Sequence, residues 1–286
     1  MASTLVVAEP GCTHEGDYGT LRRLAQAAAE AGANVFKPQW TSDPVQMCER
    51  RHIGPDHPKR AEYRRAYGWL AFPVTWHRDL RAWCRRLGMQ YACTAFLPQD
   101  VPVLAPFLDY LKVSSFEATD RELLRAALLA MPSAPEAGVR HPAVIVSTGM
   151  MEEEVDYRLW DHGQCFHPWA VLHCVSAYPA PLAAMNLGVI SGNGRHGGES
   201  AYTGLSDHSR YVLTGALAVA CGATVVEAHL RLDECSPSNP DYAAAFPPQQ
   251  FLQYVRYIRD AEIMVGDGRK RRQLCEAWAV PYQVRT

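Results

Sequence analysis

Three features are missing from the sequence: a pair of cysteines spaced C-x-x-C, a long apolar run and a surplus of basic residues. The nine cysteines are odd in number and scattered, so they predict neither a disulfide scaffold nor a zinc ribbon and are typical of a reducing cytoplasm. No apolar run approaches the roughly 20 residues that span a bilayer. The start, MASTLVVAEPG, is unlike a signal peptide, because Glu9 interrupts its short apolar run. We therefore expect a cytoplasmic protein without a membrane partner.

The charge balance argues against a nucleic-acid partner. Lysine and arginine number 28 against 30 aspartates and glutamates, which gives a net charge of −2 and no overall attraction to a polyanion. The basic cluster 269–272 is interpreted as a solvated surface. A formal G-x-G-x-x-G lies within 191–201, but it follows an expected helix and precedes an expected strand, whereas a dinucleotide fingerprint needs the opposite order. It predicts a flexible loop.

Strand-like and helix-like segments alternate along the chain. Short β-branched or aromatic runs predict strands at 5–9, 34–39, 89–96, 110–115, 143–148, 169–175, 202–208 and 224–229. Amphipathic segments predict helices around 21–28 and at 75–87, 120–131, 151–162, 209–221 and 249–264. This pattern predicts an α/β fold, a (β/α)8 TIM barrel over residues 1–267 with a short tail at 268–286. A doubly wound sheet is the alternative.

The segment 40–73 interrupts the alternation. It is longer than an ordinary connection between a strand and a helix, and we expect an irregular loop that hangs over the mouth of the barrel. Connections of this length usually carry function or move.

Polar side chains stand at the end of nearly every expected strand, which favours the barrel over the doubly wound sheet. Barrel enzymes build their active sites at the C-terminal ends of their strands. The residues at these ends include Glu9, Lys37, Gln39, Thr94, Lys112, Ser115, Glu117, Ser147, Thr148, Ser176, Tyr178, Ser206, His208, Glu227 and His229. We expect them to line one shared mouth.

His208 and His229 end the last two expected strands at matching positions. Side chains on adjacent barrel strands lie close together at equal heights, so the two imidazoles can share one divalent ion. Asp207 and Glu227 are then candidate hydrogen-bonding partners of these ligands. The alternative is that each histidine merely caps its strand and hydrogen-bonds a loop.

Charged side chains at the other strand ends predict an anionic substrate. Lys37 and Lys112 can hold a phosphate or carboxylate, with hydroxyl donors supplied by Thr94, Ser115 and Ser206. Either lysine could instead form a Schiff base, or an ordinary ion pair. The carboxylates Glu9 and Glu117 could orient a sugar hydroxyl or handle a proton or water. Tyr178 and Asp241, on later loops, could hydrogen-bond a polyol.

Several strings follow one another in order from residue 5 to about 267: AEPGCTHEGD, AGANVFKPQ, CTAF, YLKVSSFE, STGM, HCVSAYPAP, GLSDH, GATVVEAH and NPDY. In this order they resemble the sialic acid synthase family, which condenses phosphoenolpyruvate with N-acetylmannosamine or related amino sugars. The resemblance implies a (β/α)8 barrel in which His208 and His229 hold manganese or magnesium. It implies a phosphoenolpyruvate pocket at Lys37, Thr94, Lys112, Ser115 and Ser206, with Ser176 where some members have asparagine.

The resemblance also implies sugar contacts at Glu9, Gln39, Tyr178 and Asp241. In the implied reaction the metal polarises the sugar aldehyde, the enol carbon attacks it, and water handled by Glu117 and the metal leads to loss of phosphate and a 2-keto acid.

Family members usually carry a small C-terminal antifreeze-like domain, and the sequence resembles only their barrel. The acceptor sugar therefore stays open. The resemblance leaves two protein partners open: a second copy of the chain, in a homodimer, and a separate antifreeze-like protein. Two other functions also stay open: a Schiff-base aldolase or lyase that uses Lys112, and a non-catalytic sugar-phosphate-binding subunit.

Overall fold

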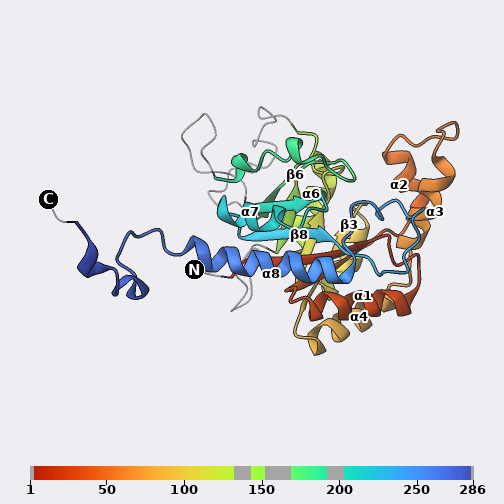
Figure 1. Ribbon diagram of the computed structural model, residues 1–286. Helices are drawn as coiled ribbons and strands as arrows, with labels where there is room; N and C mark the ends of the chain where they lie inside the picture. Colours follow the sequence, from red (N-terminus) through yellow and green to blue (C-terminus); the bar gives the residue numbers. More distant parts are fainter. Residues whose placement is uncertain (1–2, 132–142, 152–168, 192–202, 285–286) are drawn as a thin grey trace.

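The strands close into a parallel barrel in which each strand pairs with the next along the chain and the last pairs with the first. The computed structural model describes residues 3–131, 143–151, 169–191 and 203–284 (Figure 1). The strands are β1 (Leu5–Gly11), β2 (Val35–Trp40), β3 (Gln90–Ala95), β4 (Tyr110–Val113), β5 (Val144–Ser147), β6 (Trp169–Cys174), β7 (Gly204–Asp207) and β8 (Val225–His229). The TIM barrel predicted from the sequence is confirmed, and the alternative of a doubly wound sheet is wrong.

Side chains alternate between the inside and the outside of the barrel, because successive residues of a strand face opposite sides. One cluster in the interior is apolar and consists of Leu5, Val7, Val35, Ala92, Tyr110, Ile145, Ala170, Leu172 and Val225. On β7 the chain has Gly204, where a Cβ atom would lie only 1.8 Å from the carbonyl oxygen of Val225. Two residues further along several strands the buried side chains are polar: Glu9, Lys37, Thr94, Lys112 and Glu227. A polar layer therefore lies above a dry floor, at the C-terminal ends of the strands.

Helices cover the outside of the barrel (Figure 1). The α-helices of the described residues are α1 (Tyr18–Glu30), α2 (Pro44–Arg50), α3 (Arg60–Leu70), α4 (Thr75–Arg86), α5 (Asp100–Leu104), α6 (Arg121–Ala130), α7 (Thr214–Ala220) and α8 (Pro248–Val265), of which all but α2 and α3 lie around the barrel. In α1, the Asp17 carboxylate accepts a hydrogen bond from the Thr20 N–H and caps the first turn. One face of this helix is apolar and buried in the main core, at Leu21, Leu24, Ala25 and Ala28.

The predicted strands all coincide with strands of the barrel, and three predicted helices correspond closely to α4, α6 and α8. The predicted helix 209–221 begins later, at Thr214. The reason is a turn in which Asp207 accepts a hydrogen bond from the Ser209 N–H and the Ser209 hydroxyl accepts one from the Tyr211 N–H. The predicted helix 151–162, beyond its first residue, and the predicted loop 191–201, beyond Ser191, lie outside the described residues.

The segment 40–73 is not the irregular loop that its length suggested. It contains α2 and α3, which project as a pair from one side of the molecule (Figure 1), and Asp43 caps α2 through the N–H groups of Val45 and Gln46. The two helices bury a small apolar cluster with residues that follow β1 and β3: Cys12, Met47, Cys48, Ile53, Ala66, Tyr67, Leu70, Phe96 and Leu97. We call 40–73 the excursion and these side chains the satellite cluster. The cluster ties the excursion to the C-terminal ends of the strands.

The last helix, α8, ends at Val265, and the chain beyond it leads away from the barrel (Figure 1). Up to residue 284 this segment contains two short 3-10 turns, and most of its side chains are exposed. Within the described residues, no helix combines the length and the apolar character needed to cross a membrane.

Stability should depend on pH through His77 of α4. This side chain is fully buried, its Nδ1 lies 2.8 Å from the Tyr91 hydroxyl, and burial lowers its pKa from 6.5 to about 3. The unfolded chain takes up this proton below pH 6.5, so folding stability is lost as the pH falls toward 3. Between about pH 7.5 and about pH 5 the loss from this residue should be about 2 kcal/mol.

Urea unfolding at the two pH values measures this loss. His77→Gln should lose about 2 kcal/mol less than the wild type over this interval. His52→Gln, which changes an exposed histidine, is the control and should follow the wild type. Equal pH dependence in all three proteins would contradict the assignment.

Candidate active site

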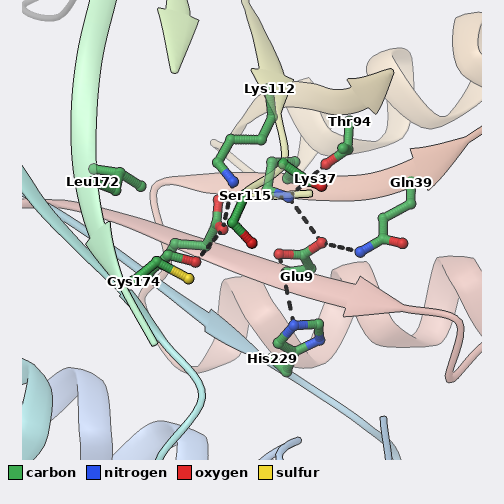
Figure 2. Close-up of polar contacts among 12 residues, drawn as sticks. Glu9, Lys37, Gln39, Thr94, Lys112, Ser115, Leu172, Cys174 and His229 are labelled. Atoms are coloured by element: carbon green, nitrogen blue, oxygen red, sulfur yellow. Dashed lines mark hydrogen bonds and ion pairs between the residues drawn. The ribbon is translucent and has the colours of Figure 1, made fainter. Parts of the chain in front are cut away.

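Two lysines and two glutamates form a buried charged network inside the barrel, and Figure 2 labels Lys37, Lys112 and Glu9 among them. Lys37 Nζ on β2 lies 2.9 Å from Glu9 Oε1 on β1 and 3.5 Å from Glu227 Oε2 on β8. Lys112 Nζ on β4 lies 3.2 Å from Glu227 Oε1. None of the four side chains is more than 5% exposed. We call these residues the charged network, and its two positive and two negative charges cancel.

The other charges of the network keep Glu9 and Lys37 ionised. Burial alone would raise the pKa of Glu9 and lower the pKa of Lys37. At Glu9 the charge of Lys37, helped by His229 and Lys112, outweighs burial and holds the pKa well below its usual value. At Lys37 the charges of Glu227 and Glu9 outweigh burial and raise the pKa. Each buried charge is therefore tolerated only because the others are present.

Hydroxyl groups surround the network. Lys37 Nζ donates a hydrogen bond to Thr94 Oγ1 at 2.8 Å, and the Ser206 hydroxyl donates one to Glu227 Oε1 at 2.9 Å. A second pair of hydroxyls, on the loops after β4 and β6, consists of Ser115 and Ser176, whose Oγ atoms lie 2.8 Å apart.

The loop after β5 approaches this serine pair closely at Gly149. A Cβ atom at Gly149 would lie 2.1 Å from Ser176 Oγ and 3.2 Å from Ser115 Cβ, so only a glycine leaves room there. Backbone and hydroxyl groups from three loops thus meet at one point, an arrangement that can hydrogen-bond an anion.

The two histidines lie side by side, as the sequence predicts. Their ring centroids are 5.3 Å apart. His208 Nδ1 lies 2.9 Å from the carbonyl oxygen of Val175 and 3.7 Å from Cys174 Sγ. Burial lowers the pKa of His208, but the hydrogen bond to Cys174 and the charge of its thiolate form outweigh burial and raise the pKa to about 9. His229 Nε2 lies 3.9 Å from Glu9 Oε2, so His229 connects the histidine pair with the charged network.

The residues present fit a divalent ion with open coordination positions. His229 Nδ1 is buried and has no hydrogen-bond partner in the described part of the chain, so this ring nitrogen is available as a metal ligand. Among the same residues, no group of three or more His, Cys, Asp and Glu side chains could hold an ion by itself. Two imidazoles with the remaining positions left to substrate and water are the pattern of a catalytic rather than a structural metal site. Binding through His208 would compete with its proton.

Asp241, on the loop after β8, approaches the histidine pair because Gly11 leaves room for it. Asp241 Oδ2 accepts a hydrogen bond from the Cys12 N–H at 2.7 Å. A Cβ atom at Gly11 would lie 2.1 Å from Asp241 Oδ2 and 3.0 Å from His229 Nδ1, and Gly11 has a φ of +53°. The end of β1 therefore requires glycine on both conformational and steric grounds.

Gln39 and Tyr178 complete the predicted sugar side of the mouth. Gln39 Nε2 donates a hydrogen bond to Glu9 Oε1 at 2.5 Å (Figure 2). The Tyr178 ring lies 4.2 Å from the His208 ring, centroid to centroid, and is 38% exposed. Tyr178 thus offers a partly open face beside the histidines.

Glu117 is held by a residue that the sequence analysis did not single out. Arg51 Nη2 lies 2.7 Å from Glu117 Oε1, and Arg51 Nε donates a hydrogen bond to the same oxygen at 2.9 Å. The Ser114 hydroxyl donates to the other carboxylate oxygen. Within the described residues, no hydrogen bond or ion pair joins Glu117 to the charged network. The sequence carries no signal for Arg51, since its neighbour Arg50 is of the same type and pairs with Asp120 instead.

The expected hydrogen-bonding partners of the histidines are wrong. Ser206 and His208 face the interior, so Asp207 between them faces outward, where its carboxylate accepts a hydrogen bond from the Tyr254 hydroxyl of α8 at 2.8 Å. Glu227 does face the interior, but its carboxylate serves the two lysines and Ser206.

Removing one charge from the network should be costly. Lys37→Met leaves Glu9 and Glu227 buried without their shared cation, and the free energy of unfolding should fall by about 3–5 kcal/mol. Urea unfolding measures this. Arg23→Met is the control, because Arg23 pairs with Glu234 on the surface and its side chain is 61% exposed. The control should change stability by less than about 1 kcal/mol, and equal losses in the two variants would contradict the network.

Solved structures share this barrel. N-acetylneuraminic acid synthetase from Leptospira borgpetersenii covers 98% of this chain and 91% of its own, with a TM-score of 0.79 and 24% identity. A truncated 3-deoxy-D-arabino-heptulosonate 7-phosphate synthase from Thermotoga maritima covers 92% of this chain and 88% of its own, with a TM-score of 0.61 and 13% identity. At these identities the likeness shows the fold alone.

Sequence relatives are synthases of several acidic sugars. N,N'-diacetyllegionaminic acid synthase of Campylobacter jejuni is 27% identical over 95% of this chain and 80% of its own length. Pseudaminic acid synthase of Campylobacter jejuni is 31% identical, over 92% of this chain and 75% of its own. The human N-acetylneuraminate-9-phosphate synthase is 24% identical, over 95% and 74%. The model of the NeuB family matches residues 24–270. The chain therefore belongs to the NeuB family and is a phosphoenolpyruvate-dependent condensing enzyme, a nonulosonic acid synthase.

Proposed function

We propose that the protein joins phosphoenolpyruvate to the open-chain aldehyde of an N-acyl amino sugar such as N-acetylmannosamine. A carbon–carbon bond forms between the enol carbon and the aldehyde carbon, and water adds to the carbon that bears the phosphate ester. The resulting tetrahedral species loses inorganic phosphate and leaves a nonulosonic 2-keto acid. The observation that supports this reaction is the charged network with its hydroxyl groups, lying beside a histidine pair at the barrel mouth.

The anion half of the proposed site comes from strand ends. Phosphoenolpyruvate carries a phosphate and a carboxylate, which need cations and hydroxyl donors. We assign this role to Lys37, Thr94, Lys112, Ser115, Ser176 and Ser206. The close pairing of Ser115 with Ser176, and the close approach of the Gly149 backbone to both serines, support a bound oxyanion there.

The acceptor half comes mainly from Glu9, Gln39, Tyr178 and Asp241. Glu9 and Asp241 are carboxylates that can accept hydrogen bonds from sugar hydroxyls, and Gln39 can both donate and accept. The exposed part of the Tyr178 ring can pack against the apolar face of a sugar. These groups lie around the histidine pair, where the aldehyde has to be for the reaction.

His208 and His229 would hold Mn²⁺ or Mg²⁺, which when bound supplies a Lewis acid for the aldehyde oxygen. Glu117 is the proposed group for orienting the water and receiving its proton. Its carboxylate suits the orienting of water because Ser114 and Arg51 fix both oxygens.

Phosphate release should require phosphoenolpyruvate, the metal and an acceptor together. The relatives are named for three different nonulosonic acids, so the acceptor is tested as a panel of N-acyl hexosamines and other aldoses. Inorganic phosphate and the 2-keto acid should form in equal amounts with at least one acceptor. Lys112→Met, which removes the proposed anion contact, should slow this by at least about 100-fold. Absence of acceptor-dependent phosphate release across the panel would contradict the proposed function.

The same enzyme preparations distinguish the proposed synthase from a Schiff-base aldolase or lyase. Lys112 Nζ lies 3.2 Å from Glu227 Oε1 in a buried ion pair, and this contact would have to break before the lysine could attack a keto acid. Borohydride reduction with a keto acid should therefore leave no adduct on Lys112, as judged by mass spectrometry. A trapped adduct would instead support an aldolase or lyase.

Loss of one imidazole should weaken metal binding. His229→Ala removes the buried ring nitrogen Nδ1 that would bind the ion. The affinity for Mn²⁺, measured by electron paramagnetic resonance, should fall by about 10–100-fold, and metal-dependent turnover should fall with it. His52→Ala, an exposed histidine, is the control. Unchanged Mn²⁺ affinity in His229→Ala would overturn the ligand assignment.

A further inference from the structure

The guanidinium of Arg51 lies in a cage of aromatic rings. Its central carbon is 5.5 Å from the Tyr67 ring centroid, 5.1 Å from that of Phe96 and 4.6 Å from that of Phe116. Arg51 Nη1 also donates a hydrogen bond to the Tyr67 hydroxyl at 3.0 Å. Rings from three separate segments therefore hold one cation in place, an arrangement unlike that of an arginine on an open surface.

The cage directs this cation at a single carboxylate. The Arg51 side chain is 17% exposed and that of Glu117 is 9% exposed, so water screens their attraction only weakly. Burial lowers the pKa of Arg51, but the Glu117 charge outweighs burial and raises it. Two guanidinium nitrogens contact Glu117 Oε1, and a third contacts Tyr67. A lysine has one nitrogen and cannot make this planar set of contacts.

The excursion provides the arginine. Arg51 follows the last residue of α2, and the neighbouring residues Met47 and Cys48 are buried in the satellite cluster. Tyr67, which contributes both a ring and a hydroxyl to the cage, lies on α3 in the same cluster. The packing of α2 against α3 therefore sets the position of the guanidinium above the loop that follows β4.

We propose that Arg51 is a positioning residue for Glu117, and that the excursion serves to deliver it. Arg51 holds Oε1 and Ser114 holds the other oxygen, so the carboxylate plane is fixed while Glu117 orients water. This inference rests on the proposed function of Glu117 and adds a residue that the function does not itself require. Because Arg51 acts through Glu117, its loss should affect turnover and leave phosphoenolpyruvate binding intact.

Steady-state kinetics on the full chain with Mn²⁺, phosphoenolpyruvate and the accepted sugar tests the proposal. Arg51→Met should lower kcat at least about tenfold and change the KM for phosphoenolpyruvate by less than about threefold. Arg51→Lys, which keeps the charge and the packing of the stem, should recover part of kcat. Arg50→Met is the matched control, since Arg50 is the adjacent arginine and pairs with Asp120, and it should retain the wild-type kcat.

A double-mutant cycle separates positioning from a direct or merely structural role. Arg51→Met combined with Glu117→Gln should be no slower than Glu117→Gln alone, because the arginine has nothing left to position. Losses that multiply, or a kcat for Arg51→Met within about twofold of the wild type, would overturn the proposal. Circular dichroism melting of each variant identifies any that fails to fold, and Arg51→Lys then carries the comparison.

Crystal structures of the wild type and Arg51→Met give a readout that does not depend on turnover. The Glu117 carboxylate should leave its wild-type orientation in the variant, and an unchanged carboxylate would overturn the proposal. If the wild type turns over no acceptor, the proposed function fails by itself, and the crystallographic comparison still decides whether Arg51 positions Glu117.

Discussion

The structure depends on four buried charges that are compatible with the barrel interior only as a group. Each of Glu9, Lys37, Lys112 and Glu227 alone would be strongly unfavourable in so dry a place. They come from four different strands, so their mutual compensation requires a closed barrel with the correct register. A slip of one residue would turn a whole strand's charges outward. The charges therefore balance only when the barrel is closed and its strands are in register. This dependence explains how an enzyme can keep such polar groups above an apolar cluster.

The neutrality of the charged network limits how it can bind an anion. Lys37 and Lys112 already face carboxylates, so a phosphate ester gains their attraction only in competition with Glu9 or Glu227. In the proposed site the additional attraction comes from groups outside the network, which are the serine hydroxyls, the backbone near Gly149 and the ion proposed for the histidine pair. A site that is neutral without its ligands also costs less to fold than one with an uncompensated positive mouth. The fold is therefore stable with a neutral network, and the proposed anion site is complete only when metal and substrate are bound.

Periodicity made the barrel predictable, and its absence made the excursion unpredictable. Strand residues alternate with a period of two, so inward polar side chains could be read directly from strand ends such as Lys37 and Glu227. The expectation that Asp207 contacts the histidines is wrong because of the same alternation: Ser206 and His208 face inward, so Asp207 faces outward, toward Tyr254. The excursion has no such regularity: its apolar residues are buried against one another and against Cys12, Phe96 and Leu97, which lie far away in the sequence. For the same reason nothing local separates Arg51 from Arg50.

The two proposed halves of the site, one for the anion and one for the acceptor, differ in which parts of the fold hold their side chains in place. The anion half stands largely on strands, where backbone pairing sets Thr94 opposite Lys112 and Ser206 opposite Glu227. The acceptor half depends on Tyr178 and Asp241, which stand on loops and are placed by local contacts such as the hydrogen bond from Cys12 to Asp241. Loops can change length and sequence without disturbing strand register, whereas a change in the strands would disturb the charged network. With the proposed assignment, this architecture favours a shared phosphoenolpyruvate site with divergent acceptors, in accord with relatives named for three different sugar acids.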